Sequence, residues 1–78
     1  VVEDEPSIQE LISVTLTRTG HDPLRAADAE TALRLLQAEL PDLVLLDWML
    51  PGQSGIDLAR RLRADERTRG VPIIMLTA

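Results

Sequence analysis

The chain has 78 residues, 45% of them hydrophobic and 27% charged, and its formal net charge is −5. This composition is typical of one small globular unit, excludes a disordered chain, and argues against direct nucleic-acid binding through this acidic segment. No apolar run approaches the ~20 residues that a membrane-spanning helix needs. Cysteine is absent, which excludes disulfides, thiol catalysis and cysteine-bound metal, and all eight basic residues are arginine.

The first half of the chain predicts a strand, a helix, a weak strand and a second helix. Val1 and Val2 are typical of the end of a strand, and we expect its beginning to lie upstream. Acidic residues and Pro6 then favour a helix start. Pro23 interrupts the short strand expected over residues 21–27, and Asp28 is a suitable N-cap for the next helix. The apolar stripes of the two helices are Ile8, Leu11, Ile12 and Leu16 in the first, and Ala29, Ala32, Leu33, Leu36 and Leu40 in the second.

The second half predicts strand, helix and strand again. Residues 42–47 contain an unbroken apolar run, which fits a parallel strand covered on both faces. Ser54 and Gly55 can open a third helix, and residues 71–77 predict a fourth strand. The buried positions expected in that helix are Leu58, Ala59 and Leu62. The alternation of strands and helices predicts an α/β fold with a parallel sheet and right-handed crossovers.

Acidic residues follow two of the predicted strands. Glu3 and Asp4 follow the first strand, Asp47 ends the third, and Thr77 ends the fourth. Because the carboxyl ends of parallel strands share one rim of the sheet, we expect these side chains to meet there. Three adjacent carboxylates need a compensating charge, and an oxygen-rich site of this kind suits Mg²⁺. With the charge neutralised, one carboxylate can attack a phosphoryl group and form an aspartyl-phosphate, while the Thr77 hydroxyl contacts a phosphoryl oxygen.

Each of these residues also has an ordinary structural interpretation. Acids before a helix, here Glu3, Asp4 and Glu5, commonly do no more than complement its macrodipole. Asp47 could simply bond to its own turn, and Thr77 could be an ordinary β-branched strand residue. The combination at one end of correctly ordered strands favours a functional site.

With these residues in place, the chain resembles the receiver domain of bacterial two-component response regulators. The resemblance is carried by residues 1–6 (VVEDEP), 41–52 (PDLVLLDWMLPG), 54–55 (SG) and 72–78 (PIIMLTA). Within the family, the run DWMLPG is most similar to the phosphate-regulon regulators of the winged-helix branch. The resemblance implies a doubly wound, flavodoxin-like fold of five strand–helix units, which stops here after the fourth strand.

The resemblance also implies roles for individual residues. Asp47 would accept a phosphoryl group from a sensor histidine kinase. Asp4 and Asp47 would ligate Mg²⁺ together with the backbone carbonyl of Met49, and Glu3 would act through water. Thr77 would be the switch hydroxyl, with Ala78 leaving room for its approach.

The chain lacks several parts of the family's pattern. The fifth strand with its phosphate-contacting lysine, the switch aromatic and two helices are missing, and no lysine here can substitute. We therefore expect residues 1–78 to be part of a receiver domain, with the output domain elsewhere. The implied protein is cytoplasmic, forms a homodimer on activation, contacts DNA only through that output domain and does not contact the membrane.

Two alternative functions remain open. A phosphatase with an aspartate nucleophile would need a second acid two residues after Asp47, where this chain has Met49. A receiver-like interaction module that takes no phosphate would not need the set formed by Glu3, Asp4, Asp47 and Thr77. The interpretation we favour is therefore a phosphoacceptor with self-phosphorylation and autodephosphorylation chemistry, rather than an enzyme.

Overall fold

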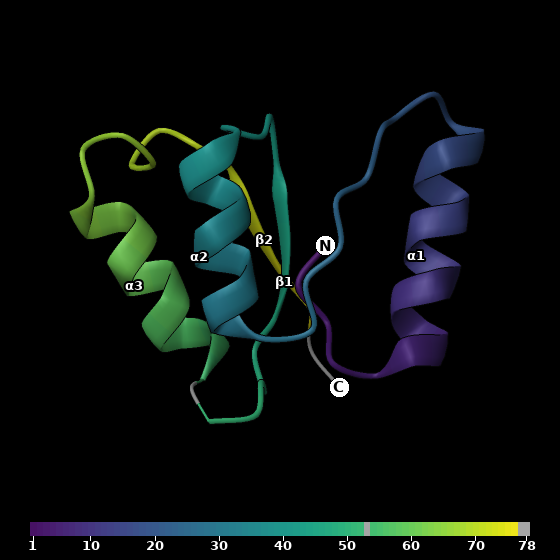
Figure 1. Cartoon of the computed structure of the whole chain (residues 1–78), viewed down its shortest axis with the longest axis horizontal. Coiled ribbons are helices and arrows are strands. Elements are labelled where there is room, and N and C mark those ends of the chain that lie inside the picture. The colour runs from purple at the N-terminus through teal and green to yellow at the C-terminus, as the bar shows by residue number, and fades with distance from the viewer. Residues whose placement is uncertain (53, 77–78) are drawn as a thin grey trace.

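The computed structural model describes residues 1–52 and 54–76, and shows three helices packed around a small parallel sheet (Figure 1). In chain order the elements are α1 (Pro6–Arg18), α2 (Ala29–Ala38), β1 (Val44–Asp47), α3 (Gly55–Ala64) and β2 (Ile73–Leu76). The order of these elements confirms the predicted α/β class.

All strand pairing in the described residues is parallel. β1 pairs with β2 in a register that places Val44 opposite Ile73 and Asp47 opposite Leu76. Val2 extends the sheet on the other side of β1 through a bridge to Leu46, and it also bridges to Ala26. The ends of the first and third expected strands therefore lie side by side, as the site prediction requires.

The strand expected over residues 21–27 is wrong in extent. Only Ala26 pairs, and residues 21–25 form no strand. Pro23 has no N–H to contribute to a ladder. The Leu24 carbonyl nevertheless accepts a bond of 2.9 Å from the backbone nitrogen of Val1, which belongs to the first expected strand. This segment is therefore held beside the first expected strand at Leu24 and Ala26, although only Ala26 forms a β-bridge.

Local sequence determines where the helices begin. The Glu5 side chain caps α1 by accepting the Ser7 N–H, next to Pro6 at the first helical position. Asp28 caps α2, and Ser54 caps α3, each by accepting an N–H three residues ahead. These caps confirm the three predicted helix starts.

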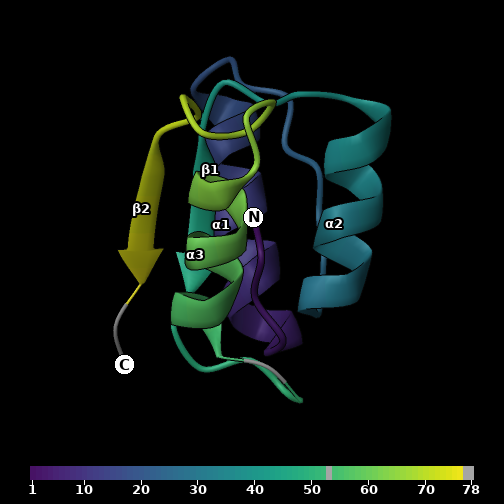
Figure 2. The same ribbon diagram turned by 90° about the vertical axis from the view of Figure 1, so that its left-hand side faces the viewer.

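The hydrophobic core lies on the side of the sheet that α2 and α3 cover, whereas α1 lies on the other side (Figures 1 and 2). Leu46 from β1 and Leu58 from α3 are completely buried. On α1 only Ser13 is buried, while Ile8 and Leu11 remain 47% and 67% exposed. Helices lie on both faces of β1, as predicted, but the buried apolar side chains are concentrated on the face toward α2 and α3.

Leu40 is a further predicted member of an apolar stripe that is exposed, as Ile8 and Leu11 are on α1. Leu40 is 47% exposed because α2 ends at Ala38, two residues before it. The buried positions of α2 are Ala29, Ala32 and Leu36, as expected.

Candidate functional site

Asp47 is the last residue of β1, and its backbone is bonded to the strand beside it. Its N–H donates to the carbonyl of Val2 at 2.9 Å, directly before the two acids Glu3 and Asp4. On the other side, the Trp48 N–H donates to the carbonyl of Leu76 at 3.3 Å. Backbone bonds of the parallel sheet therefore fix the position of Asp47 from both sides.

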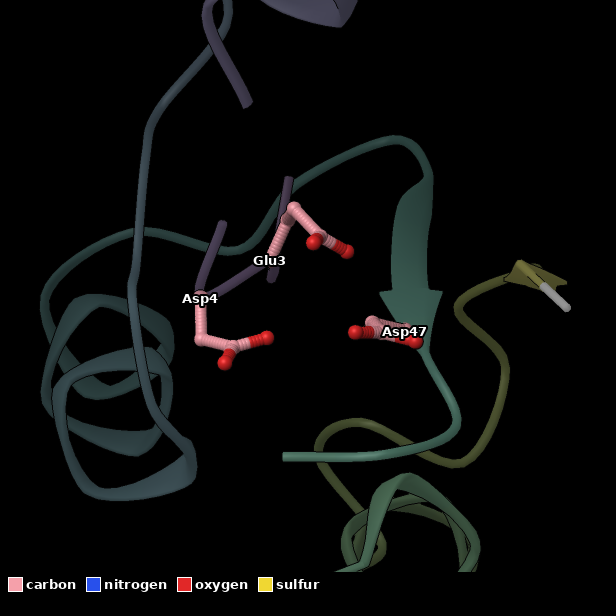
Figure 3. A group of neighbouring side chains, drawn as sticks. All are labelled: Glu3, Asp4 and Asp47. Atoms are coloured by element: carbon pink, nitrogen blue, oxygen red, sulfur yellow. The ribbon is translucent and has the colours of Figure 1, made fainter. Parts of the chain in front are cut away.

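The three predicted acids meet at this rim of the sheet. The carboxylates of Glu3, Asp4 and Asp47 each offer an oxygen, and these oxygens lie within 4.8 Å of one another. Figure 3 shows the side chains of Asp4 and Asp47 facing each other, with Glu3 beside them. Glu3 is buried, Asp47 is half-buried and Asp4 is exposed. The cluster is therefore open to solvent on the side of Asp4.

Glu3 is an unfavourable place for negative charge, because its carboxyl is buried. Burial raises the pKa of its carboxyl above the ordinary value, and the neighbouring carboxylates of Asp47 and Asp4 raise it further. The Glu5 N–H opposes this effect by donating to Glu3 Oε1 at 3.2 Å. Within residues 1–52 and 54–76, no arginine forms an ion pair with Glu3, Asp4 or Asp47, so the negative charge of the cluster has no compensating cationic side chain there.

The donor set fits a hard divalent cation. Carboxylate oxygens are the ligands that Mg²⁺ prefers, and Mg²⁺ usually keeps several of its waters. The three oxygens lie close enough to share one ion or its waters, and the exposure of Asp4 leaves an entry path. The cluster is therefore a candidate magnesium centre.

The remaining predicted site residues are less completely tested. Met49 lies beside Asp47 and its N–H donates to Asp47 Oδ1 at 3.3 Å, while the role of its carbonyl stays a prediction. Thr77 and Ala78 lie outside the described residues. The bond from Met49 also shows that Asp47 makes the ordinary turn contact of a loop-initiating aspartate, in addition to its place in the acidic cluster.

Gly55, predicted only as part of a helix start, also lies against the backbone of the site. A Cβ built on Gly55 would lie 2.1 Å from the carbonyl oxygen of Asp47 and 2.7 Å from the Cα of Trp48. The Gly55 N–H donates to the Trp48 carbonyl at 2.8 Å. The start of α3 therefore contacts the backbone of the residue after Asp47. A glycine after a short loop gave no sign of this contact in the sequence. Gly55 therefore packs directly against the backbone of Asp47 and Trp48.

A cavity of about 360 Å³ lies at the opposite end of the sheet. It is lined by residues around the start of β1, including Pro41, Leu43 and Val44, together with Leu16 and Leu36. None of the three clustered acids lines it. The chemistry predicted from the sequence is therefore separate from this cavity.

Among the described residues, no helix combines the length and the apolar character that crossing a membrane requires.

Known proteins similar to this chain include response regulators and the receiver domain of a sensor histidine kinase. The model of the response regulator receiver domain family matches residues 1–78. The phosphate regulon transcriptional regulatory protein PhoB of Pseudomonas aeruginosa is 53% identical over 78 residues. That match covers 100% of this chain but 34% of PhoB, so the chain spans about a third of the length of this relative.

Solved receiver structures have the same fold. The N-terminal domain of a response regulator receiver protein from Methanoculleus marisnigri superimposes with a TM-score of 0.95 at 40% identity, covering 99% of this chain and 63% of that one. The receiver domain of a sensor histidine kinase from Pseudomonas aeruginosa, solved with a magnesium ion coordinated in its active site cleft, gives a TM-score of 0.92 at 39% identity. That match covers 99% of this chain and 63% of the other. The chain belongs to the response regulator receiver domain family.

Proposed function

We propose that this chain is the phosphoacceptor part of a two-component signalling switch, and that Asp47 is the residue that takes the phosphoryl group. The observation that carries the proposal is the convergence of Glu3, Asp4 and Asp47 at the carboxyl end of β1. A nucleophilic carboxylate at a rim rich in further acids is what an aspartyl-phosphate site requires.

The reaction transfers one phosphoryl group between two side chains. An ionised oxygen of Asp47 attacks the phosphorus of a phosphohistidine, a new O–P bond forms, and the P–N bond breaks with its electron pair returning to the imidazole. Asp47 is only half-buried, so a donor can approach it from solvent. Asp4, Asp47 and the Met49 carbonyl would hold Mg²⁺ directly, with Glu3 acting through water. When bound, the ion neutralises the charge that builds up on the phosphoryl oxygens.

The charge of the cluster has a second role. Acids that face Asp47 repel an incoming phosphate unless a cation is present. Glu3 and Asp4 therefore make the transfer dependent on the ion, while the backbone bonds to Val2 and Leu76 keep Asp47 in place. Thr77 would contact the attached phosphoryl group, with Ala78 leaving room for that approach.

The proposed partners follow from the family. The donor is a sensor histidine kinase in the cytoplasm, and the output is a DNA-binding domain outside residues 1–78 that is regulated through homodimerisation. The names of relatives support this output, because the 53%-identical protein is a transcriptional regulatory protein and a 50%-identical one is the DNA-binding response regulator MtrA of Mycolicibacterium smegmatis. The chain would not turn over substrate as an enzyme does. Its chemistry is its own phosphorylation and dephosphorylation.

The proposal is tested on the protein expressed from its complete natural gene, with Mg²⁺ and a small labelled phosphodonor such as acetyl phosphate. We expect label that survives acid and is released by hydroxylamine, as an acyl phosphate is. Asp47→Asn should abolish it, because an amide cannot act as this nucleophile.

Asp42→Asn is the matched control, since Asp42 is an exposed aspartate that precedes the other end of β1. It should be labelled like the unaltered protein. Label that persists in Asp47→Asn would contradict the assignment of the phosphoacceptor. Sustained release of inorganic phosphate over many turnovers would indicate a phosphatase instead.

A further inference from the structure

The carbonyl of Glu3 lies where the ladder between the first strand and the Ala26 segment stops. The Ala26 N–H donates to the Val1 carbonyl at 2.9 Å, and the Glu3 N–H donates to the Ala26 carbonyl at 3.0 Å. In a continuing parallel ladder, the next bond would run from the N–H of Asp28 to the Glu3 carbonyl. Asp28 instead begins α2 as its N-cap. The Glu3 carbonyl therefore needs a donor from outside the sheet.

Gln9 of α1 supplies that donor. Its side-chain Nε2 donates to the Glu3 carbonyl at 2.9 Å and to the Ala26 carbonyl at 3.2 Å. A primary amide has two N–H groups, enough for one bond to each carbonyl. The half-buried Gln9 side chain thus closes the end of the ladder and ties α1 to both segments.

The position of these bonds bears directly on the acidic cluster. The Glu3 carbonyl belongs to the peptide unit that joins Glu3 to Asp4, so its orientation determines how the two side chains leave the backbone. Because these two carboxylates lie within 4.8 Å of that of Asp47, a rotation of this peptide would change the separation of all three. Groups that orient metal ligands from outside the coordination sphere commonly change affinity strongly when removed.

We propose that Gln9 is a positioning residue for the divalent-cation site, which it serves by fixing the Glu3–Asp4 peptide. The inference rests on the proposed function, since it needs the acidic cluster to bind a cation. Gln9 carries no charge, so it acts through geometry and leaves the net charge of the cluster unchanged. It does not itself touch the ion or the phosphoryl group.

The test measures Mg²⁺ affinity in the protein expressed from its complete natural gene, by calorimetric titration, in the unaltered protein and in Gln9→Met. Methionine has a similar length but no N–H, so both bonds are lost while the packing volume is kept. We expect the Kd for Mg²⁺ to rise about 10-fold. Gln37→Met is the matched control, because Gln37 is an exposed glutamine of α2, and it should leave the Kd unchanged.

Urea unfolding of the same variants separates positioning from general stability. A purely structural role would lower the free energy of unfolding of Gln9→Met and leave its Kd within about twofold of the unaltered protein, and that result would overturn the inference. Gln9→Asn keeps the amide but shortens the side chain by one methylene, so it should also raise the Kd and serves if Gln9→Met does not fold. Absence of Mg²⁺ binding by the unaltered protein would overturn the proposed function itself, together with this inference.

Discussion

Asp47 combines a turn contact and a place in the acidic cluster, and the two roles do not compete. One oxygen accepts the Met49 N–H at 3.3 Å, and the carboxylate still lies within 4.8 Å of oxygens of Glu3 and Asp4. The turn bond orients the carboxylate, while the neighbouring acids determine what can bind to it. The turn contact expected of a loop-initiating aspartate is therefore present, while the role of Asp47 as phosphoacceptor stays a prediction.

Gly55 is the residue whose replacement should disturb this site most directly through sterics. In Gly55→Ala the new methyl group would overlap the Asp47 carbonyl, and backbone atoms cannot turn aside as a side chain can. We expect a loss of about 2 kcal/mol in the free energy of unfolding, measured by urea denaturation. Gly70→Ala is the control, because a Cβ there meets no atom within 4 Å, and it should change stability little. Equal stability of the two variants would contradict the close contact at Gly55.

At the scale of elements, the helices were predictable and one strand was not. Helix starts depend on local chemistry, because the capping residue bonds to an N–H only two or three residues ahead. The capping residues Glu5, Asp28 and Ser54 are therefore recognisable from the sequence around them. Strand extent depends on a partner that is distant in sequence, so residues 21–27 could not reveal that only Ala26 pairs. For the same reason the sequence did not predict the contacts of Gln9 and Gly55. Gln9 bonds to the backbone of Ala26, and Gly55 contacts the backbone of Asp47 across a loop.

The cap of α2 predicts a pH-dependent contribution to stability. Hydrogen bonding from Thr31, chiefly from its N–H at 2.7 Å, holds the pKa of the Asp28 carboxyl below its usual range. An acid with a lowered folded-state pKa stabilises the fold above the unfolded value of about 3.9, and this contribution is lost as pH falls through the lower folded-state pKa. Asp28→Ala should therefore be less stable than the unaltered protein at neutral pH, with a difference that shrinks below about pH 4.

Urea unfolding at several pH values measures this difference. Asp28→Asn is the control, because asparagine keeps a capping oxygen without an ionisable group, and the pH-dependent part should disappear in it. A difference between Asp28→Ala and the unaltered protein that stays constant from neutral pH to pH 3 would contradict the assigned charge effect.

At the scale of the whole molecule, the helices bury the two faces of the sheet to different extents. The core lies between the sheet and the helices α2 and α3, while α1 leaves Ile8 and Leu11 exposed. Within the described residues β2 pairs only with β1, and Ile74 on β2 is 51% exposed. An apolar strand with an open edge favours pairing with other chains.

We therefore expect the isolated 78-residue chain to associate, with a sedimentation coefficient that rises with concentration. Ile74→Lys should reduce this association, because a lysine at a strand edge opposes edge-to-edge pairing. Ile56→Lys makes the same change at a residue of α3 that is 43% exposed, and it should leave the association unchanged. Equal effects of the two variants would show that general hydrophobicity, rather than the strand edge, drives the association.

The central claim is that one particular carboxylate of the acidic rim carries the phosphoryl group. Its most direct test is to phosphorylate the protein expressed from its complete natural gene in the presence of Mg²⁺, cleave it, and locate the modification by peptide mass spectrometry. We predict a single acyl phosphate on Asp47. A phosphoryl group found on Glu3 or Asp4, on a serine or threonine, or on His21 would contradict the account.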